Sequence, residues 1–554
     1  MLFLKPLTIQ QLHALHYISR EMITQKEKYL YTTTGSGDVV IPKFILMRPP
    51  EATSFWGIYK SWEFTSPPAD SQLQRGVSGQ MEISVSYLSF SYYDGGMPEK
   101  PIISVSGLRG IVGESLTPEL IQNYTAAYLC FLDNAGLTGP IVTSRDGRES
   151  GATILKQINS VVASGGRSSV DGGVMATPTV GIQIREQQAA GGLQITASHN
   201  PAPYNGLKLY SPAGRILNQS QGDQVLKFFH AGLAPDATQN HESRAIDSTT
   251  LPDPHAIHIE KLLATIDAAA IRKQHFKVLL DSNHGAGSTL GLQLLAELGC
   301  QTIAIGDLPN GQFAHAPEPT ADNLVDIASQ VQTTGCDLGF CQDPDADRLA
   351  LIDEQGTYIG EEYTIALCLE QCLANNPGDI VINCATSSIN HQIAAAHNCH
   401  CHESAVGEAN VVDKMIATNA IFGGEGNGGP IDPQLGFIRD SFVGMVRVLD
   451  LLASRQQTLS AATASLPKCN IHKTSVHVGN HPLQAILTAL PNRFPTAAAD
   501  FTDGLKLRWP AGQWLLIRPS NTEPIIRVIA EASTLTAAQE LCQQATAAIE
   551  VNNG

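Results

Sequence analysis

The sequence predicts an α/β protein of four domains, of which the last is a smaller α+β domain. Its 554 residues exceed what one hydrophobic core usually serves, so several domains are expected. From Met97 onward, short β-branched strands, Gly-rich turns and helical stretches follow one another, as layered α/β units require. One example is GPIVTSRDGRESG, which leads into the helical stretch ATILKQINSVVASGG.

Breaks in this pattern predict where the domains meet. Residues 231–255 contain three prolines among polar residues, a composition typical of a linker. A second break follows Asp353, and a third lies near Pro467, after which strands resume in LKLRWPAGQWLLIRP. We therefore expect the domains to span residues 97–250, 251–356, 357–468 and 469–554.

Residues 1–96 differ from the rest of the chain. They hold 14 of the 33 aromatic residues, none of the eleven cysteines, and Ser and Tyr clusters without a sustained helical period. Three interpretations are open: a small accessory domain, which Trp56 and Trp62 would suit, a disordered tail, or sequence upstream of a true start at Met97. We favour the third, because MPEKPIISVSGLRG begins the regular pattern at once.

Charge and cysteine content narrow the classes of partner and compartment. Thirty-five Lys and Arg against 52 Asp and Glu give a net charge of −17, which repels polyanions and argues against nucleic acid. An odd number of cysteines in no regular framework favours the reducing cytoplasm. No run reaches the roughly 18 apolar residues that a spanning helix needs, and Lys5 and Pro6 interrupt the apolar start, so neither a membrane nor export is expected.

The segment TASHNPAPYNGLKLY, residues 196–210, places Ser198 between a strand and a loop rich in His, Asn, Pro and Gly. Such a composition holds a hydroxyl in an exposed turn. An isolated serine here would more often only cap or turn the chain. His199 is adjacent and Lys208 lies ten residues on, so a base and a cation are available for covalent catalysis by Ser198.

In CDLGFCQDPDADRLALIDEQG, residues 336–356, an apolar strand runs into three aspartates, Asp343, Asp345 and Asp347. Carboxylates clustered in a tight loop suit Mg²⁺. An EF-hand also alternates acidic residues, but Arg348 follows directly and no Gly-then-Glu spacing completes a calcium loop. A solvated acidic turn is the weaker alternative, because three carboxylates this close repel one another unless a cation offsets them.

The segment GGEGNGGPID, residues 423–432, is a Gly-dense loop that carries one acid, Glu425, and one amide, Asn427. Both side chains can hydrogen-bond vicinal hydroxyl groups. Because Gly-rich loops have many uses, this loop is equally compatible with a flexible turn when it is considered alone.

The segment RPSNTEPIIRV, residues 518–528, lies between two apolar strands. Arginine, hydroxyl, amide and backbone donors in one turn are how proteins clamp a phosphate dianion, although a hairpin loop with a solvated Arg is an even alternative. Its candidate phosphate-binding residues are Arg518, Ser520, Asn521, Thr522 and Arg527. Arg109 in SGLRG, with Arg145 and Arg148 in SRDGRES, adds a further cationic group.

Taken together and in this order, TASHNP with YNGLK, DPDADR, GEGNGG and RPSNTEP resemble the α-D-phosphohexomutase superfamily over roughly residues 98–550. This superfamily includes phosphoglucomutase, phosphomannomutase and phosphoglucosamine mutase. The resemblance implies three related α/β domains with mixed sheets and a smaller C-terminal α+β domain around a central cleft, which agrees with the segmentation above.

The resemblance also implies a role for each motif. Ser198 would be the phosphoserine and, with Asp343, Asp345 and Asp347, would hold one Mg²⁺ per chain. Arg109, Lys208 and Arg348 would surround the transferring phosphate, with His199 beside the serine. Glu425 and Asn427 would bind sugar hydroxyls. The loop from Arg518 to Thr522, with Arg527, would clamp the phosphate that does not react.

The implied reaction interconverts hexose 6-phosphate and hexose 1-phosphate in the cytoplasm. Phospho-Ser198 would donate to the free hydroxyl, give a hexose 1,6-bisphosphate that is intermediate and activator, and take back the other phosphate. Closure by the fourth domain would exclude water. The partner is a small-molecule sugar phosphate, and the chain is a monomer or homodimer.

One departure concerns the end of the sugar loop, where many members have a His and this chain has Gly429. Lys208, His199 or a water must then serve as acid or base. The segments GEGNGG, VGEANVVDKM and RDSFVGM are most similar to phosphoglucosamine mutase or to phosphoglucomutase/phosphomannomutase members of archaeal and related bacterial type. Glucosamine phosphate is our first choice of substrate, ahead of glucose and mannose phosphates.

Two other functions compete with a mutase. A metal-dependent sugar phosphatase would use the same Ser and Asp set but release phosphate to water. A non-catalytic sugar-phosphate-binding protein would be expected to lose Ser198 or an aspartate of residues 343–347, and neither is lost.

Overall fold

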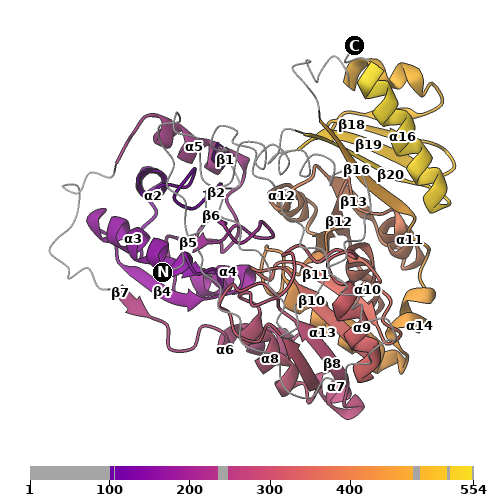
Figure 1. The fold of residues 1–554 in the computed structure, drawn as a ribbon, viewed down its shortest axis with the longest axis horizontal. Coiled ribbons are helices and arrows are strands. Elements are labelled where there is room, and N and C mark those ends of the chain that lie inside the picture. Colours follow the sequence, from indigo (N-terminus) through magenta and orange to yellow (C-terminus); the bar gives the residue numbers. More distant parts are fainter. Residues whose placement is uncertain (1–99, 105–106, 235–247, 478–486, 521–524, 552–554) are drawn as a thin grey trace, which may run out of the picture. The chain divides into compact units, whose positions relative to one another are not determined.

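The computed structural model describes residues 100–104, 107–234, 248–477, 487–520 and 525–551. The predicted N-terminal extension, residues 1–96, lies outside the described residues. The described chain forms four sheets in succession, and Figure 1 colours them from indigo to yellow along the sequence.

The first sheet is mixed and has seven strands in the order β1-β2-β6-β5-β3-β4-β7. Pairing is antiparallel from β1 to β5 along this order and parallel from β5 to β7. Its elements are β1 (Ile102–Ser104), β2 (Gly107–Ile111), α2 (Pro118–Asn134), β3 (Ile141–Arg145), α3 (Gly151–Ser164), β4 (Ser169–Val174), α4 (Thr177–Glu186), β5 (Gly191–Ile195), β6 (Tyr204–Tyr210), α5 (Gln219–His230) and β7 (Ser248–Thr250).

The second and third sheets have four strands each and are also mixed. The elements of the second unit are α6 (Ala256–Leu263), α7 (Ala268–Gln274), β8 (Lys277–Asp281), α8 (Ser288–Glu297), β9 (Gln301–Ile305), α9 (Val325–Thr334), β10 (Leu338–Gln342) and β11 (Leu349–Asp353). Those of the third unit are α10 (Glu361–Asn375), β12 (Ile380–Asn383), α11 (Ile389–Ala396), β13 (Cys401–Ser404), α12 (Glu408–Thr418), β14 (Phe422–Glu425), β15 (Gly429–Ile431), α13 (Ser441–Arg455) and α14 (Leu459–Ala464).

The fourth sheet is antiparallel throughout, in the order β16-β20-β19-β18-β17. Helix α16 packs on it. The elements are β16 (Ile471–His477), the short 3-10 helix η1 (Leu490–Arg493), β17 (Ala498–Asp500), β18 (Leu505–Arg508), β19 (Trp514–Pro519), β20 (Ile525–Glu531) and α16 (Leu535–Val551). The predicted fold class, three α/β units with mixed sheets and a smaller α+β unit, is confirmed, whereas the exact domain bounds stay predictions.

The first three units share one strand order, which explains why their motifs recur at equivalent places. The strands β6-β5-β3-β4, β11-β10-β8-β9 and β15-β14-β12-β13 each have one antiparallel pair followed by two parallel pairs. The strands β5, β10 and β14, which each form the antiparallel pair of their unit with the next strand, therefore each lead into a hairpin loop from the carboxyl end. Carboxyl ends of strands are where α/β sheets usually place their ligands.

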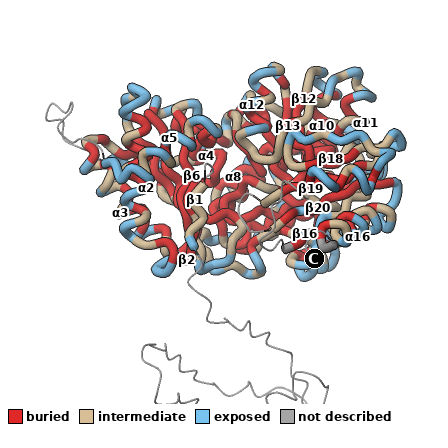
Figure 2. The backbone as a smooth tube through the Cα atoms, turned by 90° about the horizontal axis from the view of Figure 1, so that it is seen from above, coloured by how far each residue is buried: buried red, intermediate tan, exposed pale blue. Residues whose placement is uncertain are grey.

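The alternating side chains of β3 show that helices cover both faces of the first sheet. Ile141 packs in a cluster with residues of α2, α3 and α5, whereas Val142 packs in a different cluster with residues of α4. Because neighbouring side chains of a strand point to opposite faces, the helices cover both sides of this sheet. In Figure 2 the buried segments lie in the interior and the exposed segments lie at the periphery.

Helix α13 joins the second and third units. It contacts α6 and α7 of the second unit and α10 and β15 of the third, and thirteen of its residues are buried. One continuous hydrophobic cluster therefore includes residues of both units, from Leu262 to Ala462. A helix that is buried all round is expected to fix the two units relative to each other.

Glu531, at the end of β20, connects the fourth unit to the third. It is 5% exposed and accepts hydrogen bonds from the Ser387 hydroxyl at 2.5 Å, the Ser388 backbone N–H at 2.8 Å and Trp514 Nε1 at 2.6 Å. Three donors thus converge on one buried carboxylate, and two of them come from the third unit.

We expect Glu531→Gln to lower the free energy of unfolding by about 1–3 kcal/mol, because the amide replaces one acceptor oxygen by a donor that faces other donors. Urea unfolding followed by circular dichroism measures this effect. Glu540→Gln, an exposed position on α16, is the matched control and should change stability by less than about 0.5 kcal/mol. Equal unfolding curves for both variants would contradict the assigned role of Glu531.

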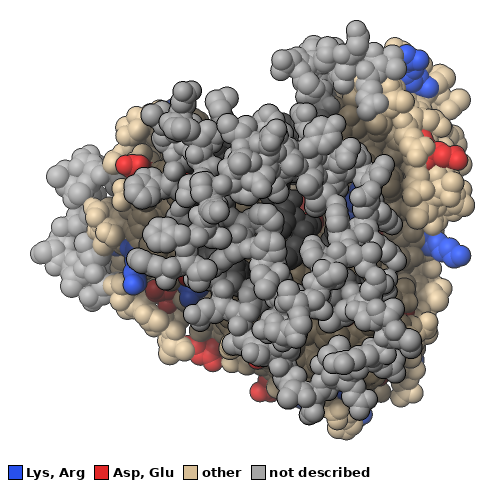
Figure 3. Space-filling view, viewed as in Figure 1, with Lys and Arg blue, Asp and Glu red and all other residues tan. Residues whose placement is uncertain are grey.

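The described surface gives two further observations. On the face drawn in Figure 3, the visible basic side chains lie singly or in small groups, interspersed with acidic ones. Among the described residues, the helices are too short or too polar to cross a membrane.

Candidate active site

Ser198 lies in the hairpin loop between β5 and β6. Its φ of 49° is in the left-handed region, which non-glycine residues seldom occupy, so the surrounding structure must hold it there. The Ser198 backbone N–H donates a hydrogen bond of 2.9 Å to Thr196 Oγ1, and Ser198 is only 1% exposed. The loop therefore presents a buried hydroxyl in a fixed position.

Arg148 holds this loop through hydrogen bonds to its backbone carbonyl groups. Its Nη2 donates to the carbonyl oxygens of Ser198 at 2.7 Å and Asn200 at 2.6 Å, and its Nη1 donates to that of Pro201 at 2.8 Å. Its Nε donates to Asp146 Oδ2 at 3.1 Å. We predicted Arg148 as part of a phosphate-holding cationic group, but four of its donor contacts are committed to the loop backbone and to Asp146.

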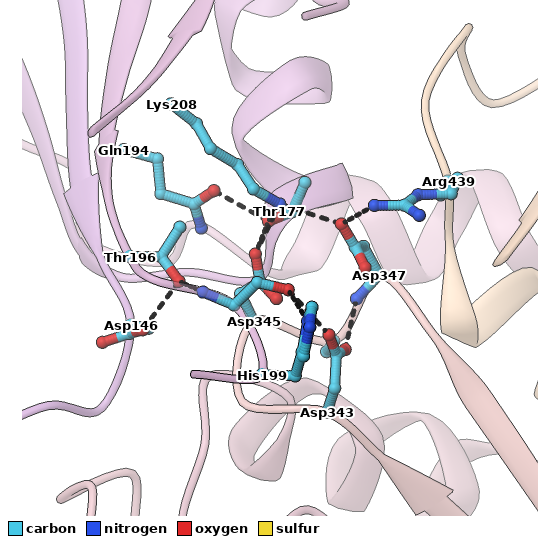
Figure 4. A network of polar contacts seen from close by, with 12 residues as sticks. Asp146, Thr177, Gln194, Thr196, His199, Lys208, Asp343, Asp345, Asp347 and Arg439 are labelled. Carbon is cyan, nitrogen blue, oxygen red and sulfur yellow. Dashed lines mark hydrogen bonds and ion pairs between the residues drawn. The ribbon is translucent and has the colours of Figure 1, made fainter. Parts of the chain in front are cut away.

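Asp343, Asp345 and Asp347 lie in the equivalent hairpin loop of the second unit, between β10 and β11 (Figure 4). All three are fully buried, and each offers an oxygen within 4.8 Å of the others. The Ser198 hydroxyl donates a hydrogen bond of 3.1 Å to Asp343 Oδ2. The tertiary structure thus brings the serine and the acidic loop together.

Two oxygens of this acidic cluster, Asp345 Oδ1 and Asp347 Oδ1, are buried and have no hydrogen-bond partner among the described residues. An unpaired buried carboxylate oxygen is costly, and clustered carboxylates repel one another. A hard divalent cation would take these oxygens as ligands. These carboxylate oxygens therefore fit the predicted Mg²⁺ site.

Lys208, on β6, contacts the other oxygens of the same two aspartates. Its Nζ donates to Asp345 Oδ2 at 2.6 Å, Asp347 Oδ2 at 2.8 Å and Thr177 Oγ1 at 3.3 Å, which uses all three donors of an ammonium group. Burial alone would lower the pKa of Lys208, but the carboxylates of Asp345 and Asp347 outweigh burial and raise this pKa. Lys208 is therefore a fixed cation in this arrangement.

The three aspartates differ in their affinity for protons. Burial raises the pKa of Asp343 well above its ordinary value, and the neighbouring carboxylates raise it further. Burial also acts to raise the pKa of Asp345, but Lys208 outweighs it and lowers this pKa. For Asp347, Arg439 and Lys208 together outweigh burial and lower the pKa. In the metal-free protein, Asp343 is thus the member of the cluster that binds a proton most readily.

His199 lies beside the serine, with its Nδ1 3.3 Å from Ser198 Oγ. Burial lowers the pKa of His199 well below its ordinary value, and the guanidinium groups of Arg348 and Arg109 lower it further. His199 is therefore neutral near pH 7, and a neutral imidazole can accept a proton.

Arg109 and Arg348 lie at the edge of the acidic cluster. Arg109, on β2, donates from Nη1 to Asn200 Oδ1 at 3.2 Å. Arg348 Nε is 3.7 Å from Asp347 Oδ1 and 3.9 Å from Asp343 Oδ2, and it is buried without a hydrogen-bond partner among the described residues. These separations exceed hydrogen-bond distance, so this N–H remains available to an anion.

Glu425 ends β14, and Asn427 lies in the equivalent hairpin loop of the third unit, between β14 and β15. Glu425 Oε1 accepts hydrogen bonds from Asn383 Nδ2 at 2.7 Å and from the Gly407 backbone N–H at 3.0 Å. Asn427 Oδ1 is buried and has no partner within the described chain. A Cβ at Gly429, at the end of this loop, would lie 2.4 Å from the Arg439 side chain, so the absence of a side chain there leaves room for Arg439.

Arg439 connects these loops and was missed by sequence reasoning. Its Nη2 donates to Asp347 Oδ2 at 2.7 Å, its Nη1 to Glu425 Oε2 at 2.9 Å and its Nε to Glu408 Oε2 at 3.1 Å. It immediately precedes Asp440, the N-cap of α13. RDSFVGM was part of the family resemblance, but nothing in that segment indicates which distant carboxylates its arginine contacts.

The predicted phosphate-clamping residues lie in the fourth unit. Arg518 on β19 and Arg527 on β20 are cross-strand partners, and Arg518 Nε donates to Asp503 Oδ2 at 2.9 Å. The Ser520 backbone N–H donates to the Ile525 carbonyl at 2.9 Å. The remaining predicted members, Asn521 and Thr522, lie outside the described residues.

A multidomain α/β phosphotransferase is the class that this fold and this serine–carboxylate site define. The chain belongs to the phosphoglucomutase/phosphomannomutase family, because models of all four of its domains match in order. Alpha/beta/alpha domains I, II and III match residues 101–234, 256–356 and 361–469, and the C-terminal domain matches residues 483–548. The protein is accordingly a phosphohexomutase, an isomerase that acts as an intramolecular phosphotransferase.

Two curated relatives illustrate the range of the family. A phosphoglucomutase/phosphomannomutase of Thermococcus kodakarensis is 34% identical over 438 residues, which cover 78% of this chain and 95% of the relative. A phosphoglucosamine/phosphogalactosamine mutase of Sulfurisphaera tokodaii is 29% identical over 460 residues, which cover 81% of this chain and 99% of the relative.

Solved structures show the same fold. A phosphoglucomutase/phosphomannomutase family protein of Burkholderia thailandensis has a TM-score of 0.71 at 23% identity, covering 81% of this chain and 97% of that one. The phosphoglucomutase pp63/parafusin of Paramecium has a TM-score of 0.70 at 17% identity, covering 82% and 96% respectively.

Proposed function

We propose that the protein interconverts glucosamine 6-phosphate and glucosamine 1-phosphate through a phosphorylated Ser198. The observation that carries this proposal is the 3.1 Å hydrogen bond from the Ser198 hydroxyl to Asp343. It sets a buried hydroxyl beside a cluster of carboxylates, two of whose oxygens have no hydrogen-bond partner among the described residues. The seryl phosphate is transferred to the free hydroxyl of the sugar phosphate, and the resulting hexose 1,6-bisphosphate returns its other phosphoryl group to Ser198.

Mg²⁺ is the metal we expect at Asp343, Asp345 and Asp347, with the seryl group as a further ligand. When bound, it would neutralise charge on the phosphoryl oxygens. Lys208 supports this site because it binds the Oδ2 atoms of Asp345 and Asp347, whereas their Oδ1 atoms have no hydrogen-bond partner among the described residues.

His199 is our candidate for the proton acceptor. Phosphoryl transfer forms a bond from the sugar oxygen to phosphorus and breaks the bond from phosphorus to Ser198 Oγ, while the proton of the sugar hydroxyl leaves. His199 Nδ1 lies 3.3 Å from Ser198 Oγ. Lys208 is a weaker candidate, because its neighbouring carboxylates keep it protonated and an ammonium group has no lone pair to accept a proton. Arg109 and Arg348 then hold the transferring phosphate.

The sugar loop and the fourth unit supply the remaining binding groups in this proposal. Glu425 and Asn427 bind sugar hydroxyls, and Arg518, Ser520, Asn521, Thr522 and Arg527 hold the unreacting phosphate. Glucosamine phosphate is preferred because one relative is named for amino-sugar phosphates, and glucose or mannose phosphate is the alternative because another is named for those sugars. We expect a cytoplasmic monomer or homodimer.

The direct test incubates the purified protein with Mg²⁺, a trace of hexose 1,6-bisphosphate and one hexose 6-phosphate at a time: glucosamine, glucose or mannose. We expect hexose 1-phosphate to form without stoichiometric release of inorganic phosphate. Release of phosphate without formation of 1-phosphate would instead identify a phosphatase, and no conversion of any sugar would identify a binding protein.

Metal binding should stabilise the protein. Removal of divalent metal with EDTA and re-addition of Mg²⁺ at about 100 times its Kd should raise the free energy of unfolding by about 2.7 kcal/mol, because only the folded chain assembles the three carboxylates. Thermal unfolding with and without Mg²⁺ measures this difference, and Asp345→Asn should remove most of it. Equal midpoints for the EDTA-treated and Mg²⁺-loaded wild type would contradict a metal site here.

A further inference from the structure

Glu408 is the first residue of α12, in the segment VGEANVVDKM, and the function proposed above gives it no role. Its side chain is 10% exposed, and its Oε2 accepts the hydrogen bond from Arg439 Nε at 3.1 Å. The same guanidinium contacts Asp347 of residues 343–347, the metal loop, and Glu425 of residues 423–432, the sugar loop. Glu408 therefore lies in the same charge cluster as both loops.

The other oxygen of this carboxylate, Glu408 Oε1, is buried and has no hydrogen-bond partner within the described chain. Glu425 differs, because three donors from Asn383, Gly407 and Arg439 engage its two oxygens. Buried polar groups are almost always paired, and an unpaired carboxylate oxygen is costly. The pairing of Glu408 is thus incomplete until a donor from outside the protein arrives.

Contacts to the first unit fix Glu408 relative to the serine loop. Arg215, which follows β6 in sequence, donates from Nη2 to the Ala409 carbonyl at 3.1 Å and pairs through Nη1 with Asp413 at 2.7 Å. Strand β6 also carries Lys208. The first half of α12 is therefore anchored to the segment that follows β6 in the first unit.

The local charge favours a cationic donor over a neutral one. Glu408 and Glu425 both pair with the guanidinium of Arg439, which also pairs with Asp347, whereas Asp347 has further cations in Lys208 and Arg348. Burial raises the pKa of Glu408 to about 7, although Arg439 opposes this shift. An ammonium group at Oε1 would supply both a hydrogen bond and the missing positive charge, and such charge-assisted bonds are about twice as strong as neutral ones.

We infer that Glu408 is a specificity-determining residue, whose unpaired Oε1 accepts the ammonium group of an amino-hexose phosphate. This inference rests on the proposed mutase function and deepens it, because it names the group that distinguishes amino sugars from glucose or mannose phosphate. A purely structural Glu408, which only pairs with Arg439 at the start of α12, would support all sugars equally.

Glu408→Gln is the decisive variant, because the amide keeps the size of the side chain and an oxygen for Arg439 but removes the charge. With wild type as reference, we expect kcat/KM for glucosamine 6-phosphate to fall roughly 10- to 100-fold and that for glucose 6-phosphate to fall less than about threefold. The matched control is Glu297→Gln, which makes the same chemical change at an exposed position on α8. It should change the ratio of the two kcat/KM values by less than about twofold.

Calorimetric binding in the Ser198→Ala background separates recognition from chemistry. We expect the addition of Glu408→Gln to weaken the binding of glucosamine 6-phosphate roughly 10-fold or more. The affinity for glucose 6-phosphate should change by less than about threefold. Equal losses for both sugars, or no loss for either, would overturn the inference. Failure of the proposed function is recognised separately, because the wild type itself would then convert neither glucosamine 6-phosphate nor any other hexose phosphate.

Discussion

Ser198→Ala is expected to lower phosphohexomutase turnover by at least about 10⁴-fold, because it removes the oxygen that we propose as the carrier of the phosphoryl group between substrate positions. The hydroxyl lies 3.1 Å from Asp343, and the Ser198 backbone is held by Thr196 and Arg148. Alanine also has a Cβ, so the backbone at φ 49° carries a similar strain in both proteins. The loss should therefore be chemical and not structural.

Formation of hexose 1-phosphate and intact-mass analysis for a phosphoryl group measure this effect. Ser211→Ala is the matched control, because the Ser211 hydroxyl is also buried in the first unit but donates only to the Arg215 carbonyl. The control should keep activity within about threefold and should keep the phosphoryl group. Turnover by Ser198→Ala near the wild-type rate would rule out the serine as phosphoryl carrier.

Arg439→Gln is expected to have the second largest effect, because one buried guanidinium pairs with carboxylates of three segments, Asp347, Glu425 and Glu408. Removing one partner from a buried ion-pair network leaves uncompensated charge, which costs about 3–5 kcal/mol of folding free energy. We also expect kcat/KM to fall about 10²- to 10³-fold, since the metal loop and the sugar loop lose their common contact. Arg439→Lys should be intermediate, because an ammonium group cannot reproduce the planar fork of three contacts.

Urea unfolding and steady-state kinetics of the same preparations measure the two effects. Arg455→Gln is the matched control: Arg455 lies at the other end of α13, is partly exposed and pairs with Glu370. Its loss should cost no more than about 1 kcal/mol. An Arg439→Gln protein with wild-type stability and kinetics would show that the charges of the three carboxylates are balanced by other groups.

Much of the candidate site could be predicted from the sequence because each of its loops is local. Ser198, the aspartates of residues 343–347 and Glu425 each lie in a short segment that follows an apolar strand, and all three hairpins occupy the same place in units of one strand order. Residue types within about five positions carry this signal, since carboxylates, glycines and a serine in one turn define its chemistry.

The partners of these loops could not be predicted in the same way. Their contacts join residues far apart in the sequence. Arg148 contacts the Ser198 carbonyl across 50 residues, and Arg439 contacts Asp347 across 92. Glu408 contacts Arg439 across 31 residues. Lys208 was predicted as a possible base, but only its contacts to Asp345 and Asp347 show that its donors are already used.

The sequence by itself determined the fold class, the order of the loops and the serine and acidic cluster that we propose as the centre of the site. The tertiary structure decided which cation faces which carboxylate, and which oxygens of Asp345, Asp347 and Glu408 lack a hydrogen-bond partner in the described part of the chain. The physical reason is that motif chemistry depends on neighbours along the chain, whereas the charge and protonation of a buried group depend on neighbours in space.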